Sequence, residues 1–265
     1  MFKNLLSKFT TTRFRSVAGS DAGVFAVDTD GILYSWSDYG SFLGRSGTEY
    51  IPTQVPHLTN VKSVACYSQT IVALMDNGTL YAWGRYVKDL TQVEGIEEDA
   101  IISEPTLVKT IADVDEIAVS NERFLFLKKD GTVWAVGKNR EFSLGTGCAG
   151  DVAIPARIPN LEHISQVALS EKAGIAVSED GIVYTWGEVV EALGQENETK
   201  KTIPFPVKDL SSVTKVAVEG HYFLALTIDG SVYEWGIHPA SSSYRPDYLP
   251  MKKLDLPPCQ GYCSL

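Results

Sequence analysis

One short phrase recurs five times in this chain and constrains its fold more than any other feature. The phrase is Asp-Gly or Asn-Gly followed by apolar and aromatic residues, as in DGSVYEWG at residues 229–236. With the Gly of each phrase as a marker, successive markers lie 47 to 53 residues apart. A spacing in this range is typical of repeat proteins whose units pack against their neighbours. The marker glycines are Gly31, Gly78, Gly131, Gly181 and Gly230.

Each phrase predicts a β-hairpin. Asp-Gly and Asn-Gly supply the positive φ angles of a tight two-residue turn, and the flanking runs are rich in β-branched and aromatic residues. Tyr233 and Trp235 are two residues apart and share one face, whereas Val232 and Glu234 point to the other. Because a single hairpin cannot cover its own apolar face, we expect these aromatic side chains to fill the space between packed sheets. The expected core tryptophans are Trp36, Trp83, Trp134, Trp186 and Trp235.

Each unit continues through a variable loop and ends in a strand that begins with proline, such as PTQV at 52 and PARI at 155. Four short strands in about 50 residues are typical of a β-propeller blade. The sequence therefore predicts an all-β propeller of five four-stranded units, as either a closed ring or an open arc. We expect a basic N-terminal segment at 1–13, the repeats at 14–256 and a tail at 257–265.

The DGxVYxWG phrase, the LGxG loop and the PxxV strand resemble the units of the regulator of chromosome condensation repeat family. The resemblance covers 14–256, although the best-known members have seven units. It implies a propeller that binds the small GTPase Ran and promotes its active state by preferring the nucleotide-free form. Short standalone members that act as bacterial effectors on host Ran are similar. The alternatives are a scaffold or inhibitor module for another protein, and chromatin binding as in the founding member.

A plant photoreceptor of this family suggests a second role for the tryptophans, as a light-sensing cluster. Each tryptophan of this chain, however, occupies an aromatic position of the repeat. We therefore expect core packing and not light sensing.

The variable loops are the expected partner-binding region, because propellers carry function there. The stretch from Trp83 to Pro105 is the longest of the five. By its length it is similar to the wedge with which the founding member drives exchange on Ran; a solvated acidic loop is the alternative. Its acidic residues are Glu94, Glu97, Glu98, Asp99 and Glu104, and the other candidates near the ends of the repeated phrases are Asp38, Arg85, Lys138 and Glu188.

Charge and motifs exclude several other functions. The net charge is −10, and the first twenty residues hold four basic and no acidic side chains, so the body is more acidic than the total. Nucleic-acid binding needs clustered Lys and Arg, which only the N-terminal segment offers. GTGCAG at 145–150 matches a dinucleotide fingerprint, but Pro155 and Pro159 forbid the helix that should follow. We expect no catalytic residue, metal, cofactor or small-molecule substrate.

The two ends raise the question of membrane contact. Residues 1–13 contain Phe2, Leu5, Leu6 and Phe9, which suits a targeting or membrane-surface helix, or else a frayed or strand-pairing terminus. In the tail CQGYCSL, Cys263 is third from the end, whereas a prenylation box needs a fourth-from-last Cys. Cys259 and Cys263 stay candidate lipid sites. The irregular cysteines favour a reducing compartment, so we expect a cytoplasmic protein, in the host cytosol if it is a secreted effector.

Overall fold

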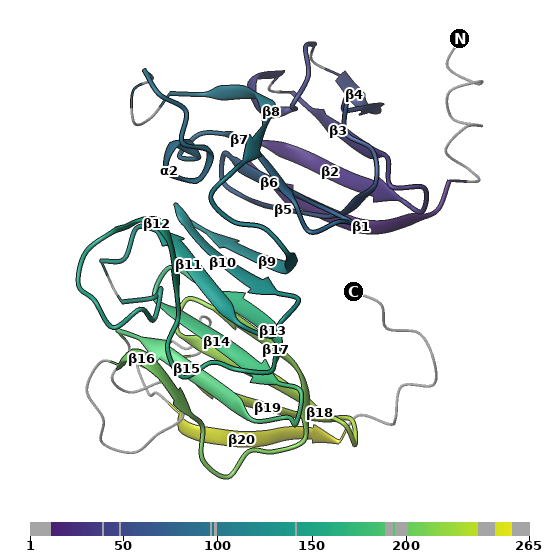
Figure 1. Cartoon of the computed structure of the whole chain (residues 1–265). Coiled ribbons are helices and arrows are strands. Elements are labelled where there is room, and N and C mark those ends of the chain that lie inside the picture. Colours follow the sequence, from purple (N-terminus) through teal and green to yellow (C-terminus); the bar gives the residue numbers. More distant parts are fainter. Residues whose placement is uncertain are drawn as a thin grey trace. The chain divides into compact units, whose positions relative to one another are not determined.

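The computed structural model describes residues 12–38, 40–47, 49–95, 97, 100–140, 142–188, 193, 201–237 and 247–255. These residues form five four-stranded antiparallel sheets and two short helical segments, η1 (Gly40–Phe42) and α2 (Lys88–Thr91) (Figure 1). The predicted all-β fold with five four-stranded units is confirmed. No helix within the described ranges has the length and apolarity needed to cross a membrane.

Strands pair in chain order within every sheet. The chain divides into two compact units between Val114 and Asp115. The first unit holds the first sheet, β1 (Phe14–Ser20), β2 (Gly23–Asp28), β3 (Leu33–Ser37) and β4 (Glu49–Gln54), and the second sheet, β5 (Val61–Tyr67), β6 (Thr70–Met75), β7 (Leu80–Gly84) and β8 (Ile102–Val108). The second unit holds the third sheet, β9 (Val114–Ser120), β10 (Arg123–Lys128), β11 (Val133–Gly137) and β12 (Val152–Arg157), the fourth, β13 (Ile164–Leu169), β14 (Ala173–Ser178), β15 (Val183–Gly187) and β16 (Lys201–Pro206), and the fifth, β17 (Val213–Glu219), β18 (Tyr222–Thr227), β19 (Ser231–Gly236) and β20 (Asp247–Asp255).

The hairpin turns differ from the predicted two-residue type. All five marker glycines have positive φ, from +76° to +89°, but none of the Asp or Asn residues before them does. The turn instead spans four residues, as where the Gly131 N–H donates to the Lys128 carbonyl at 2.9 Å. The Asp130 side chain accepts the Thr132 N–H at 3.0 Å, so this Asp favours the turn by a side-chain hydrogen bond and not by its own backbone angle. The prediction of paired positive φ angles was wrong.

At Gly31 and Gly181, glycine is needed for a second reason, the close approach of the next sheet of the same unit. The Gly181 carbonyl accepts the Val213 N–H at 3.2 Å, and a Cβ on Gly181 would lie 2.8 Å from the Ser212 Cα. Gly31 meets Asn60 in the same way in the first unit, at 2.9 Å. Any side chain would therefore clash with backbone as well as strain φ.

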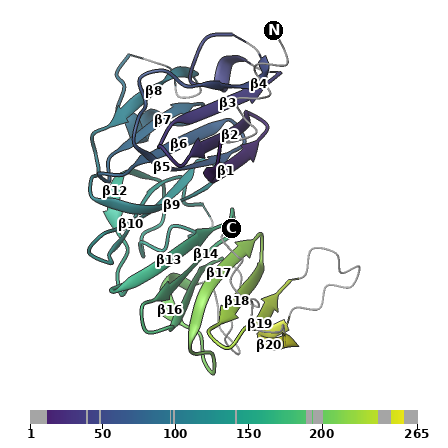
Figure 2. The ribbon, with the colours of Figure 1, turned by 90° about the vertical axis from the view of Figure 1, so that its right-hand side faces the viewer.

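Neighbouring sheets within a unit pack through the tryptophans. Trp186 of β15 is fully buried and shares a core with Val133 and Ala135 of the third sheet. Trp235 packs in the same way between the fifth and fourth sheets, and Figure 2 shows β13 and β17 of these sheets side by side. In the first unit, Trp83 meets Phe25 edge to face, with ring centroids 6.0 Å apart. Trp36 and Trp134 are half-buried.

In the first and third sheets, the loop after the third strand holds the tryptophan of the following sheet. The Trp83 Nε1–H donates to the Phe42 carbonyl at 2.8 Å, and the Trp186 Nε1–H donates to the Ser143 carbonyl at 2.7 Å. A Cβ on Gly145 would lie 2.7 Å from the Trp186 ring. The Leu-Gly sequence of the loop thus gives the indole a carbonyl acceptor and room to sit.

Candidate functional site

One end of each sheet carries the turn between its first two strands and the residue that follows its third strand. Backbone hydrogen bonds join these two segments in both units. We call this end the loop end, because the variable loops also leave from it. The bonds run from the Arg85 N–H to the Gln69 carbonyl (2.8 Å), from Lys138 to Glu122 (2.9 Å) and from Glu188 to Lys172 (3.2 Å).

The predicted acidic residues of the first unit do not all belong to one loop. Glu94 and Glu97 are exposed on the connection between α2 and β8. Glu104 is exposed as well, but it lies within β8 and therefore belongs to the sheet. Asp38 is exposed after β3, and Arg85 is half-buried after β7, where its carbonyl accepts the Thr70 hydroxyl at 2.7 Å.

Other sequence candidates lie outside the described residues. These are Glu98 and Asp99 of the acidic stretch and the tail cysteines Cys259 and Cys263. The N-terminal residues 1–11 lie outside them as well. Wedge contacts, lipid attachment and cellular location accordingly stay predictions.

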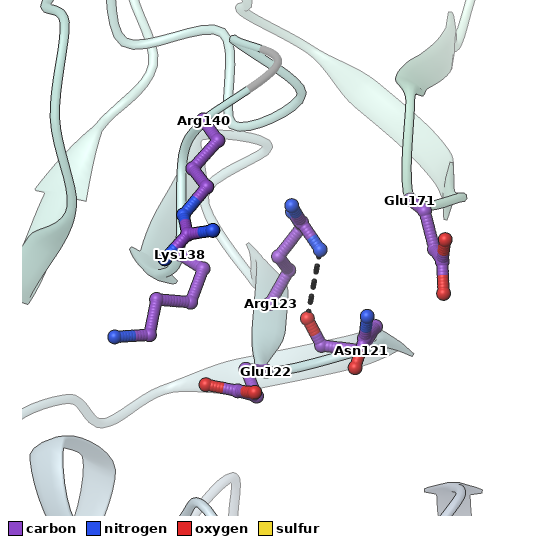
Figure 3. A pocket seen from close by; sticks show the side chains of 6 residues that line it. All are labelled: Asn121, Glu122, Arg123, Lys138, Arg140 and Glu171. Atoms are coloured by element: carbon purple, nitrogen blue, oxygen red, sulfur yellow. Dashed lines mark hydrogen bonds between the residues drawn. The ribbon is translucent and has the colours of Figure 1, made fainter.

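In the second unit, Lys138 lies in a polar pocket of about 210 Å³ at the loop end. The pocket combines the β9–β10 turn, the segment after β11 and the β13–β14 turn (Figure 3). Residues that are distant in the sequence therefore meet here because the third and fourth sheets are neighbours. The lining residues are Asn121, Glu122, Arg123, Lys138, Arg140 and Glu171.

Arg123 is the most unusual of these residues, because it is buried. It is the first residue of β10 and only 5% exposed, and its Nη1 donates to the Asn121 carbonyl at 2.8 Å. Eight residues before the marker glycine, other sheets hold Thr70 in β6 and Ala173 in β14. Sequence reasoning missed Arg123, although its departure from the repeat at this position was a signal that could have revealed it.

Asp151 holds the segment after β11 in place. Its Oδ1 accepts the Asn139 N–H at 3.0 Å, and its Oδ2 lies 3.3 Å from the Lys138 Nζ. Burial raises the pKa of Asp151, but the Asn139 N–H, Lys138 and the nearby Arg140 outweigh burial and bring this pKa below its ordinary value. Asp151 is therefore ionised at neutral pH and fixes the Lys138 ammonium at the pocket.

Glu188 belongs to a separate cluster of the same unit. It lies near His221, whose pKa is lowered by burial first and by the Lys172 charge second, while Glu188 opposes both effects. His221 is therefore favoured in its neutral form. Glu188 is not among the residues that line the pocket of Lys138, although its N–H is bonded to Lys172, the residue next to the pocket residue Glu171.

The polar groups at the loop end include several charged side chains. Within the described ranges, no three His, Cys, Asp or Glu side chains gather to hold a metal ion. Cys66 and Cys148 are free thiols, and burial raises the pKa of Cys66, an effect partly opposed by a hydrogen bond with Ser20. The pocket offers charged donors and acceptors to a partner.

Comparison with known proteins identifies the repeat. The family model of the regulator of chromosome condensation (RCC1) repeat matches residues 61–85 and again 130–177. Protein pim1 of Schizosaccharomyces pombe is 30% identical over 207 residues, which cover 68% of this chain and 38% of pim1. The chain belongs to the RCC1 repeat family. Guanine nucleotide exchange factor SRM1 of Saccharomyces cerevisiae is 26% identical over 192 residues, 64% of this chain and 40% of SRM1.

Solved structures share the fold. Human WBSCR16 superposes with a TM-score of 0.72 at 20% identity, covering 91% of this chain and 67% of WBSCR16. Yeast RCC1 (Prp20), solved with Kap60, gives a TM-score of 0.71 at 22% identity, with 91% and 64% covered. This RCC1-repeat chain spans less than half the length of pim1 and of SRM1.

Proposed function

We propose that this RCC1-repeat chain binds a small GTPase of the Ran class and promotes the exchange of its guanine nucleotide. The observation that carries the proposal is the similarity to a relative named guanine nucleotide exchange factor, over 64% of this chain. A structure of Prp20p from S. cerevisiae, described with its binding to Gsp1p and histones, shares the fold at a TM-score of 0.70 and 22% identity.

Exchange of this kind requires binding and no reacting side chain. A protein that binds the nucleotide-free GTPase more tightly than the loaded form shifts the population toward nucleotide release. The loop ends supply charged side chains for such contacts, including Arg85 in the first unit and Lys138 in the second.

The test is release of a fluorescent guanine nucleotide from Ran. We expect the release rate to rise with the concentration of the chain. If the chain neither binds Ran nor accelerates release at micromolar concentration, the proposal is wrong.

The acidic connection is tested by a second variant in the same assay. Residues 93–101 are replaced by a short Gly-Ser linker, which leaves α2 and β8 intact because β8 begins at Ile102. Under the wedge hypothesis the variant loses exchange activity while its circular dichroism spectrum is unchanged. If exchange continues at the full rate, this stretch is only a solvated loop.

A second candidate function is that of a module that binds another protein without exchanging a nucleotide. Human E3 ubiquitin-protein ligase HERC2 is 30% identical over 194 residues, which cover 69% of this chain and 4% of HERC2. Related repeats therefore occur in a protein named for a different activity. Affinity capture with mass spectrometry, followed by the exchange assay, separates the two: a captured partner whose nucleotide state does not change favours the scaffold role.

A further inference from the structure

The pocket of the second unit contains a buried arginine at a repeat position where the other sheets hold no arginine. Thr70 and Ala173 occupy the same repeat position in sheets of the same architecture, so a blade forms without an arginine there. Arg123, which is 5% exposed, is therefore a feature of the third sheet and not of the repeat in general.

Three cationic side chains of the third sheet and its loop line this pocket. Figure 3 shows Lys138 and Arg140 on one side, Arg123 in the middle with its hydrogen bond to Asn121, and Glu171 on the opposite side. Arg140 is exposed and lies two residues after Lys138, which is ion-paired with Asp151. The Asn121 carbonyl fixes the orientation of the Arg123 guanidinium, and a guanidinium binds a carboxylate through two parallel hydrogen bonds.

The acidic side chains of the pocket select among anions. Glu122 and Glu171 line it beside the cations, so a ligand with two or more negative charges meets repulsion as well as attraction. A single carboxylate of the partner can accept hydrogen bonds from the guanidinium groups. The backbone N–H groups of the partner next to that carboxylate can donate to Glu122 and Glu171. This pattern favours an acidic side chain on a protein over a phosphate group or a nucleic-acid backbone.

We propose that the pocket lined by Arg123, Lys138, Arg140, Glu122 and Glu171 binds one Asp or Glu side chain of a protein partner. This inference deepens the proposed function. It takes from that function only the assumption that a protein partner binds at the loop end of the second unit. It does not require that this protein be a GTPase.

The direct test uses short peptides on the full chain. An acetylated, amidated hexapeptide with one central Glu is titrated while the guanidinium Nε–H signals of Arg123 and Arg140 are followed by NMR. Matched peptides carry Gln or phosphoserine at the same place. We expect the Glu peptide to shift both signals and to bind about tenfold more weakly to Arg140→Glu, since a charge-assisted hydrogen bond contributes roughly this factor.

The matched control is Arg157→Glu, which reverses another exposed arginine of the same unit, one that is ion-paired with Glu162 at 3.1 Å. This variant should bind the Glu peptide as the unaltered chain does. The proposal fails if the Gln peptide shifts the signals equally, if the phosphoserine peptide binds more tightly, or if both variants weaken binding alike. An unchanged melting temperature of Arg140→Glu verifies its fold.

The exchange assay separates failure of this inference from failure of the proposed function. If the Glu peptide binds at the pocket but the chain does not accelerate nucleotide release from Ran, the pocket assignment holds and the GTPase assignment is wrong. If Ran exchange is normal in Arg140→Glu and no peptide binds, the GTPase assignment holds and the pocket assignment is wrong.

Discussion

Gly174→Ala provides a quantitative test of how the sheets pack. Gly174 lies opposite Trp186 in the β14–β15 pair, and a Cβ there would lie 2.2 Å from the Trp186 Cε2. Carbon atoms in contact are about 3.5–4 Å apart, so the methyl group would overlap the ring by more than about 1 Å. The ring cannot move away easily, because its Nε1–H is bonded to Ser143 and Gly145 lies against it.

The expected cost follows from two opposing effects. Overpacking a closed core costs about 1–3 kcal/mol, and this overlap is severe, so about 3 kcal/mol is expected. The alanine also restricts the unfolded chain, which stabilises the fold by about 0.5 kcal/mol because the backbone angles of Gly174 are not of the left-handed kind. The net loss in the free energy of unfolding is therefore about 2.5 kcal/mol.

The measurement is denaturation by guanidinium chloride followed by circular dichroism. Gly19→Ala is the matched control, because Gly19 also lies in a strand, at ordinary φ, and a Cβ there would meet no atom within 4 Å. In a Trp186→Phe background we expect Gly174→Ala to cost about 1–2 kcal/mol less, since the two residues are in contact. Equal midpoints for Gly174→Ala and Gly19→Ala would refute this account of the packing.

Three further outcomes are expected. Gly181→Ala should lower the free energy of unfolding by about 1–3 kcal/mol, because residue 181 has a positive φ and a side chain there would clash with the next sheet. The loss should exceed that of Gly150→Ala, whose Cβ would meet nothing within 4 Å. Similar losses for the two variants in thermal melts would refute the close approach. Arg45→Met should cost about 1–3 kcal/mol, because the buried Ser35 carbonyl loses the Arg45 Nη2 donor at 2.9 Å; a neutral result in urea unfolding would contradict this. Because folding lowers the pKa of Asp151, its stabilising effect is complete above the ordinary Asp pKa and is lost as pH falls through the folded value. Asp151→Asn should therefore flatten the acid side of the stability profile, and an unchanged profile between about pH 2 and 6 would refute that assignment.

The repeat made the blade architecture predictable from local features. Alternation of side chains along a strand places Tyr184 and Trp186 on one face, and both contribute to the core shared with the preceding sheet. The turn type was not predictable in the same way. Asp-Gly suits more than one hairpin turn, and only the backbone hydrogen bonds distinguish a two-residue turn from the four-residue turn that ends at Gly131.

The sequence by itself determined the number of sheets, the strands within them and the face on which each aromatic side chain lies, because these depend on periodicity over a few residues. Only the tertiary structure decided that Glu104 belongs to a strand and that Arg123, Arg140 and Glu171 share a pocket with Lys138. Those residues come from three separate stretches of the chain, and the distances between them depend on strand register and on the packing of two neighbouring sheets. Neither quantity is encoded in the residues of any single stretch.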